Sequence, residues 1–308
     1  MNLFDFVRVS LFGISSLGAT HILGCLRRFP LGFSAVLSAG AYTAACLRIY
    51  QNWPWAICIV VACAAGALIC VIPALFDRCL EGDEYVVLSW MMAMACAEAI
   101  GLMKITGGQH SLIGIPPLLR GASGFTMSAI LLMAVFGGAT AVGWVFRRSY
   151  AYEESLLAGL NPHALSSAGR SPYRTSLHVH LIGGAIGGLA GAFWGSLYQT
   201  LHPSQFGLSE SVVILLICLL GGQGEPAGVL VGLVAVFALP QALNFARVAP
   251  ALAALSRYIG VSPPDATIVA NSLNQAFLGV LLVATVVWCK RGITPSVSKA
   301  LQHRKGSR

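Results

Sequence analysis

Nine stretches of predominantly apolar residues alternate with short polar connections along the chain. They cover residues 6–26, 31–49, 53–76, 85–105, 124–146, 176–199, 209–222, 226–246 and 271–289. A bilayer core is about 30 Å thick, and an α-helix needs about 20 apolar residues to cross it. The pattern therefore predicts an all-α integral membrane protein, a bundle of about nine transmembrane helices. The seventh stretch is short, which favours a tilted or broken helix surrounded by protein or lining a water-filled cavity.

The composition favours a lipid environment for this bundle. Of the 308 residues, 56% are hydrophobic and 10% are charged, and the mean hydropathy is +0.77. A soluble domain has about 25% charged residues, so a soluble fold is excluded. Asp5 and Arg8 interrupt the start of the first stretch and no small-residue cleavage site follows it, so we expect this helix to stay in the mature protein.

Lysine and arginine residues fall unequally on the two sides that nine crossings define. Thirteen lie on one side and six on the other. Because cytoplasmic loops are enriched in these residues, the side with thirteen is predicted to be cytoplasmic, with the N-terminus outside. The net charge of +8 therefore indicates orientation in a membrane and not binding of nucleic acid.

The prediction is a single transmembrane domain over residues 1–308 with two polar segments on the cytoplasmic side. Residues 147–175 form the longest connection there and contain a predicted short helix, Ala164–Ala168. Residues 290–308 form a basic tail that could contact anionic lipid headgroups. The charged connection Asp77–Glu84 is predicted to be a solvated surface, with docking to a partner protein as the alternative.

Glycines recur at intervals of four residues in two places. Gly183, Gly187, Gly191 and Gly195 form one series, and Gly224, Gly228 and Gly232 form another. Such a face lets helix backbones approach closely, which matters where lipid offers no hydrophobic driving force. We interpret these glycines as helix-packing positions, and Gly221 and Gly222 as part of a tight turn at the membrane edge.

Ionisable residues inside apolar stretches are candidates for function. Glu98 lies within the fourth stretch, and Glu210 lies at the mouth of the seventh. For Glu98 the choice is between a place on a translocation or proton path and a polar contact with a neighbouring helix. For Glu210 the alternative is simple solvation.

Motifs of enzymes, metal sites and nucleotide sites are missing from the sequence. His178 and His180 are two residues apart, so on a helix they point to different faces and a shared metal is not expected. The nine cysteines contain no C-x-x-C pair and lie mostly in apolar stretches, where they act as packing residues. The G-x-x-x-x-G-K-[ST] pattern is also absent, so any ATP that drives this protein would bind to another subunit.

Four short motifs follow one another along the chain. The first is Leu31-Gly32 with Gly40-Ala41-Tyr42-Thr43-Ala44-Ala45, the second Gly82-Asp83 with Tyr85, and the third Thr106-Gly107-Gly108 with Gly114-Ile115-Pro116. The fourth runs from Gly188-Leu189-Ala190-Gly191-Ala192 through Pro203, Phe206-Gly207 and Ile214-Leu215-Leu216 to Gly221-Gly222-Gln223-Gly224, Gly228, Gly232 and Pro240. In this order and spacing the chain resembles the permease subunits of branched-chain amino acid ABC importers, specifically the M-type member of the pair.

The resemblance implies an ATP-driven importer in the bacterial inner membrane. The chain would pair with a second permease, two cytoplasmic ATPases would dock on residues 147–175, and an external binding protein would deliver the solute. No cofactor would bind to this chain itself. The implied coupling residues are Asn161, Pro162, Ala164, Ser166 and Gly169, with Arg170 and Arg174 facing acidic ATPase surface. Tyr42 and Thr43 join Glu98 and Glu210 as candidates for the translocation path.

The solute and one alternative function stay open at this point. Branched-chain amino acids, amides, urea and small carboxylic acids all fit the resemblance, and Val213 stands where the family usually carries a Glu. The alternative is a self-sufficient secondary transporter or channel with Glu98 as its ion or proton site. A membrane enzyme is disfavoured because the sequence shows no nucleophile–base or metal constellation.

Overall fold

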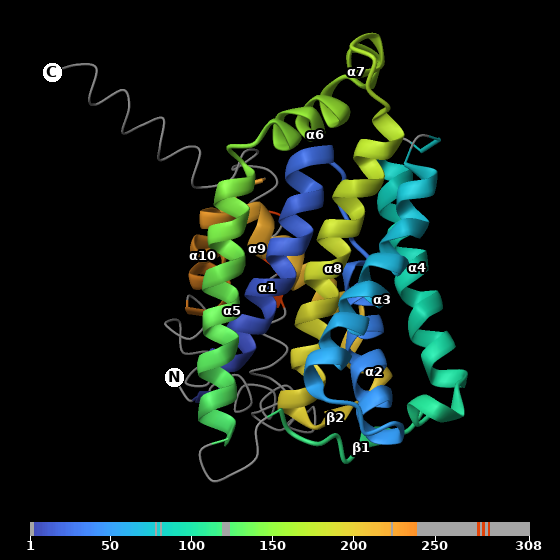
Figure 1. Cartoon of the computed structure of the whole chain (residues 1–308), viewed down its shortest axis with the longest axis vertical. Coiled ribbons are helices and arrows are strands. Elements are labelled where there is room, and N and C mark those ends of the chain that lie inside the picture. Colours follow the sequence, from blue (N-terminus) through green and yellow to red (C-terminus); the bar gives the residue numbers. More distant parts are fainter. Residues whose placement is uncertain are drawn as a thin grey trace, which may run out of the picture.

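The chain, described here from a computed structural model, is a bundle of long helices (Figure 1). The structure describes residues 3–77, 79–80, 82–118, 124–222 and 224–238, together with isolated positions between 276 and 283. The helices are α1 (Leu3–Leu26), α2 (Phe33–Tyr50), α3 (Trp55–Phe76), α4 (Gly82–Leu102), α5 (Gly124–Phe146), α6 (Tyr150–Leu160), α7 (Pro162–Ser167), α8 (Pro172–Tyr198), α9 (Leu208–Gly221) and α10 (Pro226–Leu233). The shorter elements are the 3-10 turns η1 (Lys104–Thr106) and η2 (Pro203–Phe206), the π-helical turn η3 (Val234–Ala238) and the strands β1 (Leu112–Ile113) and β2 (Thr200–Leu201).

Six helical stretches in the described residues are long and apolar enough to cross a membrane. They are Phe6–Leu26, Trp55–Phe76, Gly82–Leu102, Thr126–Phe146, Pro172–Tyr198 and Pro203–Gly221. The second predicted stretch is also helical, as α2, and so is the described part of the eighth, residues 226–238, as α10 with η3, but neither meets both criteria. The ninth, 271–289, and the basic tail lie outside the described residues, apart from the isolated positions. The all-α membrane fold is confirmed, with a helix number roughly consistent with the predicted nine.

Helix α8 occupies the centre of the bundle and packs against α1, α2 and α3 (Figure 1). Its glycines face all three neighbours. A Cβ on Gly183 would lie 2.9 Å from the carbonyl oxygen of Gly18 on α1, and one on Gly184 would lie 2.6 Å from that of Gly66 on α3. A Cβ on Gly187 would lie 2.8 Å from the ring of Phe33 on α2. Only residues without a side chain let three helices approach α8 this closely.

The outer helices show the opposite pattern. Most residues of helices α3, α4 and α5 are exposed or half-buried, whereas α1 and α8 are largely buried. Exposed large side chains such as Val60, Leu68, Met91 and Val142 lie on these outer helices. In a membrane protein such faces contact lipid, so the exposed apolar surface needs no further protein to cover it.

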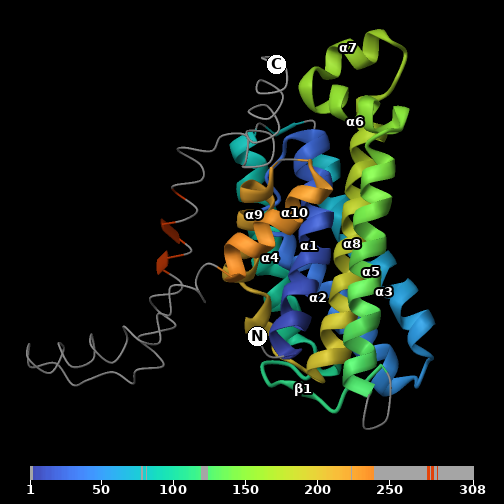
Figure 2. The same cartoon turned by 90° about the vertical axis from the view of Figure 1, so that its left-hand side faces the viewer.

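Two interruptions of regular helix shape the inside of the bundle. Residues 27–32 connect α1 to α2, with Arg27 in the left-handed region at φ 55°, and α2 begins at Phe33 beside the middle of α8. The predicted seventh stretch, 209–222, forms one short continuous helix: α9 follows η2 after Gly207 and then forms a hairpin with α10 (Figure 2). Strands β1 and β2 pair antiparallel at the end of the bundle opposite α6 and α7.

Candidate functional site

Helices α6 and α7 lie outside the bundle at one end, where α1 ends and α8 begins (Figures 1 and 2). Gly159 on α6 rests on the last turn of α1, since a Cβ there would meet the carbonyl oxygen of Cys25 at 2.5 Å. The side chain of Asn161 caps α7 by accepting a hydrogen bond from the Ala164 amide at 3.0 Å. Pro162 occupies the first position of α7, where a backbone N–H would have no acceptor within the helix, so the N–H that proline lacks is not needed. The predicted short helix is therefore present, and it begins at Pro162.

The residues predicted to couple to ATPases lie on the outer surface of α7 and on the segment that leads into the first turn of α8. Asn161, Pro162, Ser166, Gly169, Arg170 and Arg174 are exposed, and Ala164 is half-buried. Leu165 alone in α7 is buried and anchors the helix. The guanidinium of Arg170 lies 3.6 Å from the carboxylate of Glu154 on α6, and its side chain is 68% exposed. These residues therefore offer a small, mixed polar surface that other proteins can reach.

A buried polar network lies directly below this hairpin. Arg28 Nε lies 2.7 Å from Asp77 Oδ1, and Arg28 Nη2 donates to the backbone oxygen of Asp77 at 3.0 Å. The hydroxyl of Ser176 donates to Asp77 Oδ2 at 2.7 Å. The network thus joins the segment after α1, the end of α3 and the start of α8. The connection Asp77–Glu84 was predicted to be solvated, and for Asp77 this prediction is wrong because its side chain is only 11% exposed.

The network continues inward through a histidine. His180 Nδ1 lies 2.9 Å from the backbone oxygen of Ser176, and Nε2 lies 2.8 Å from the hydroxyl of Tyr85 on α4. A carbonyl oxygen only accepts, so Nδ1 carries the hydrogen, and in the neutral ring Nε2 accepts from Tyr85. His180 is fully buried and His178 is exposed, so the two histidines do point to different faces.

A cavity of about 300 Å³ separates the network from α7. Asp77 and Ser176 line it from the bundle, and Pro162, His163 and Ser166 line it from the hairpin. The structure therefore brings two predicted coupling residues next to a network that sequence reasoning missed. Opposite charges at the ends of the first and third apolar stretches were the only signal for it.

The candidates for the translocation path gather at a second cavity, towards the opposite end. This cavity of about 420 Å³ is lined by Glu98 and Trp90 of α4, by Gln109, and by residues 202–204 and 206–208. Glu98 is exposed rather than buried. The carboxylate of Glu210 accepts a hydrogen bond from the Gly207 amide at 3.2 Å and so supports one wall of the cavity.

The two candidates on α2 lie behind this cavity. The ring of Tyr42 packs edge-on against Phe206, which lines the cavity, with 6.0 Å between ring centroids. The Tyr42 hydroxyl is buried and has no hydrogen-bond partner among the described residues. Thr43, the next residue along α2, is half-buried. Three of the four candidates are therefore connected to one cavity, and Thr43 is not.

The glycines of the fourth motif build the turn between α9 and α10. Gly222 and Gly224 have φ values of 109° and 80°, which residues with a side chain rarely adopt. A Cβ on Gly221 would collide with the backbone of Gly228, and one on Gly232 would collide with that of Ile217. On α8, a Cβ on Gly191 would collide with the backbone of α2. Gly191, Gly221, Gly224 and Gly232 thus lie at contacts between backbones.

Comparison with known proteins identifies the family. Residues 3–286 match the family described as branched-chain amino acid transport system / permease component. The chain belongs to this permease family. It is 22% identical over 330 aligned positions to the high-affinity branched-chain amino acid transport system permease protein LivM of Escherichia coli K12, an alignment that covers 96% of this chain and 70% of that protein. The LivM protein of Salmonella typhimurium LT2 is 23% identical, with 95% and 70% covered. No solved structure matches the chain.

As a permease with several apolar helices, the chain is a multi-pass membrane protein. Its family is one of transport proteins and not of enzymes. No group of three or more His, Cys, Asp or Glu residues in the described part of this permease is placed to hold a metal ion. The permease therefore presents an exposed hairpin above a polar network at one end and a polar cavity at the other.

Proposed function

We propose that this chain is the permease subunit of an ATP-driven ABC importer for branched-chain amino acids or related small solutes. Its membership of the permease family carries the proposal. A second permease subunit would complete the translocation path, and two cytoplasmic ATPases would supply the ATP sites, because the sequence of this chain contains no nucleotide-binding motif. An external binding protein would deliver the solute, whose class includes amides, urea and small carboxylates.

The hairpin α6–α7 is the proposed docking site for the ATPases. It is exposed, it is capped by its own residues, and it rests on α1 through Gly159. Through the cavity below it the hairpin adjoins Asp77, which directly follows α3, and Ser176 of α8. A displacement of α7 would therefore reach three helices through one polar network, as alternating access requires of a bistable bundle.

The charges at the two ends of the bundle support one orientation. The end that carries α6 and α7 includes six arginines next to the ends of α1, α5 and α7 and the start of α8, namely Arg27, Arg28, Arg147, Arg148, Arg170 and Arg174. Fewer cations lie towards the other end: Arg8 in the first turns of α1, Arg48 in the last turn of α2 and Lys104 in η1. The positive-inside rule then places the hairpin in the cytoplasm of a bacterial cell and the second cavity towards the outside. The N-terminus would be outside and the C-terminal tail inside.

Purification of the tagged chain from its native membrane, with mass spectrometry of the co-purified proteins, tests the proposal. We expect a second permease and ATPases, and ATP-dependent uptake after reconstitution. Replacing residues 161–166 with a Gly/Ser linker should abolish uptake and leave the second permease bound, whereas Asn161→Ser, which keeps a cap, should retain uptake. Recovery of the chain alone after cross-linking would contradict the importer assignment.

A secondary transporter or channel is the second candidate, and the position of Glu98 on a cavity favours it. In that case the chain alone should move solute in liposomes without ATP, and Glu98→Gln should stop this movement. In the importer, Glu98→Gln should leave the dependence on ATP unchanged.

A further inference from the structure

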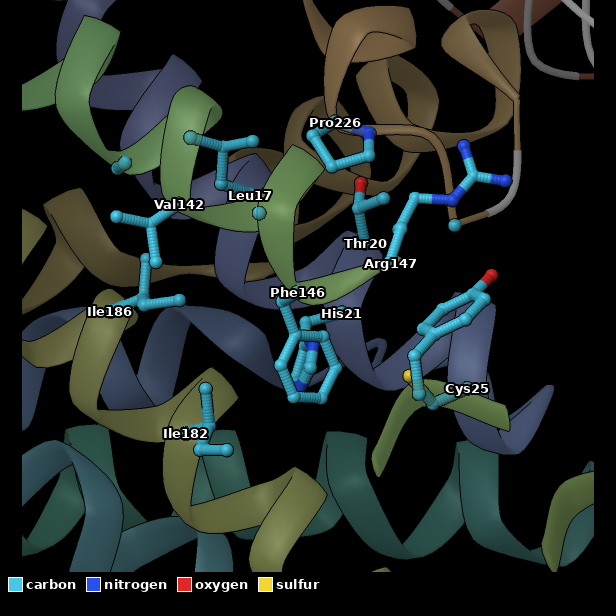
Figure 3. A pocket seen from close by; sticks show the side chains of 14 residues that line it. Leu17, Thr20, His21, Cys25, Val142, Phe146, Arg147, Ile182, Ile186 and Pro226 are labelled. Atoms are coloured by element: carbon cyan, nitrogen blue, oxygen red, sulfur yellow. The ribbon is translucent and has the colours of Figure 1, made fainter. Parts of the chain in front are cut away.

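A third cavity, of about 380 Å³, lies between α1, α5 and α8 near the hairpin end (Figure 3). Residues of α1 line it from Leu17 to Cys25, and residues of α5 line it from Ala139 to Arg147. Eight residues of helix rise about 12 Å, so the cavity is elongated along the helix axes. The proposed translocation cavity shares no residue with this space, and α6 of the hairpin borders it only through Tyr152.

One side of the cavity faces the bilayer. Val142 and Ile182 line it and are 69% and 42% exposed, so the surfaces of α5 and α8 beside it are surfaces that contact lipid. Protein interiors are close-packed, with few voids larger than a water molecule. Apolar cavities do not hold stable water. A space of this size that opens to lipid is therefore filled most readily by a hydrocarbon chain from the bilayer.

Arg147, the charged residue among those described as lining the cavity, lies at the end near the hairpin. There Arg147 Nη1 pairs with Glu225 at 3.3 Å, and its guanidinium lies 5.6 Å from the ring centroid of Tyr152. The Arg147 side chain is one-third exposed and its guanidinium has five N–H groups, so donors remain for a second anion. Next to it the guanidinium of Arg148 stacks on the exposed ring of Trp144. Tryptophan is enriched at the headgroup level of membranes, which places Arg147 at the same level.

A second polar group lies just below Arg147. The ring of His21 packs against Phe146, with 5.0 Å between centroids, and its Nε2 is buried without a hydrogen-bond partner among the described residues. Among the residues that the structure describes, no Asp or Glu lines the cavity, so these residues offer nothing to the ammonium group of an amino acid.

We propose that this cavity binds one acyl chain of an anionic phospholipid, with the lipid phosphate at Arg147. The acyl chain would fill the space between α5 and α8. The lipid phosphate and the carboxylate of Glu225 would both pair with Arg147. Because lipid gains no hydrophobic free energy by moving from the bilayer into an apolar cavity, the charge at Arg147 decides which lipid is selected. This site goes beyond the proposed transport function and does not depend on it.

Photo-cross-linking tests the site on the full chain with its co-purified partners. The protein is reconstituted into phosphatidylcholine nanodiscs that contain a small fraction of phosphatidylglycerol with a photoactivatable acyl chain. We expect labelling to concentrate on residues 139–147 and 182–186, above the level on the lipid-facing residues Val60 and Leu68 of α3. Equal labelling of both surfaces would overturn the proposal.

Matched variants test the two ends of the site separately. Ala139→Phe fills the cavity and should reduce labelling to the α3 level, whereas Ala141→Phe, on an exposed position of α5 that does not line the cavity, should not.

Arg147→Gln should reduce the preference for phosphatidylglycerol over a phosphatidylcholine probe about fivefold, the effect of one cation at a membrane surface. Arg148→Gln should keep most of the preference for phosphatidylglycerol. If Ala139→Phe does not fold, the labelling pattern of the wild-type protein and the comparison of Arg147→Gln with Arg148→Gln still test the proposal. Competition by leucine would show a solute site and contradict the lipid assignment.

Discussion

The hydroxyl of Ser176 donates a hydrogen bond to Asp77 Oδ2 at 2.7 Å, although the two residues are 99 positions apart in the chain. The other carboxylate oxygen of Asp77 pairs with Arg28. One carboxylate thus holds together three parts of the bundle directly below the proposed ATPase-docking hairpin. Its burial makes each of these contacts matter for stability as well as for coupling.

Asp77→Asn should destabilise the protein by about 3 kcal/mol, because it leaves the largely buried guanidinium of Arg28 without its counter-charge. Thermal unfolding of the purified protein in detergent measures the effect. Arg170→Gln is the matched control. It breaks an ion pair whose arginine is 68% exposed, and should change the stability by less than about 1 kcal/mol. Equal effects of both changes would contradict the buried pairing.

Tyr85→Phe should destabilise the protein by about 1–3 kcal/mol, since it leaves His180 Nε2 buried without a partner. Tyr150→Phe removes the same hydroxyl from a side chain that is 91% exposed, and should have no measurable effect. Unfolding midpoints of the two variants give the comparison. A neutral result for Tyr85→Phe would mean that the ring finds another donor.

Gly224→Ala should destabilise the turn between α9 and α10 by about 1–2 kcal/mol, because an L-residue is strained at φ 80°. Its Cβ would also lie 2.9 Å from Gly24 on α1. Gly137→Ala on α5 is the control, since nothing lies within 4 Å of its Cβ and alanine favours helix. The two changes should therefore shift the unfolding midpoint in opposite directions, and shifts of the same sign would show that the turn tolerates a side chain.

Asn161→Ala should weaken α7 by about 1 kcal/mol, because it removes the N-cap of this helix. Amide hydrogen exchange in residues 162–167 should become faster, and ATP-driven uptake should fall. Asn161→Ser keeps a capping oxygen and should preserve both properties. Unchanged exchange in the alanine variant would show that Leu165 alone holds α7 in place.

Much of the fold was predictable because membrane helices are local features of a sequence. The stretch 124–146 coincides with α5, and residues 53–76 differ from α3 by two positions at the start. The short seventh stretch, 209–222, was expected to be a tilted or broken helix, and it forms the continuous helix α9, which begins and ends one position earlier. The start of α2 was predicted two residues early, because the turn after Pro30 extends to Gly32.

The candidate sites were less predictable. The sequence placed Asn161 and Pro162 in one polar loop, but it gave no reason to connect them with Asp77. Glu98 was selected as a carboxylate within an apolar stretch, and the structure places it exposed on a cavity wall. A position in an apolar stretch shows that a residue lies in the membrane, and it does not show which way the side chain faces.

The sequence by itself determined the membrane class, the positions of most spans, the spacing of the glycines and the family. These properties depend on the length of apolar stretches and on motifs of a few residues, which are local in the sequence and do not depend on how the helices pack. Only the tertiary structure decided that α8 is central, that Arg28 and Ser176 share one carboxylate, and that a cavity separates α5 from α8. Such pairings depend on which helices become neighbours, and in lipid that choice follows from the packing of small residues over the whole bundle.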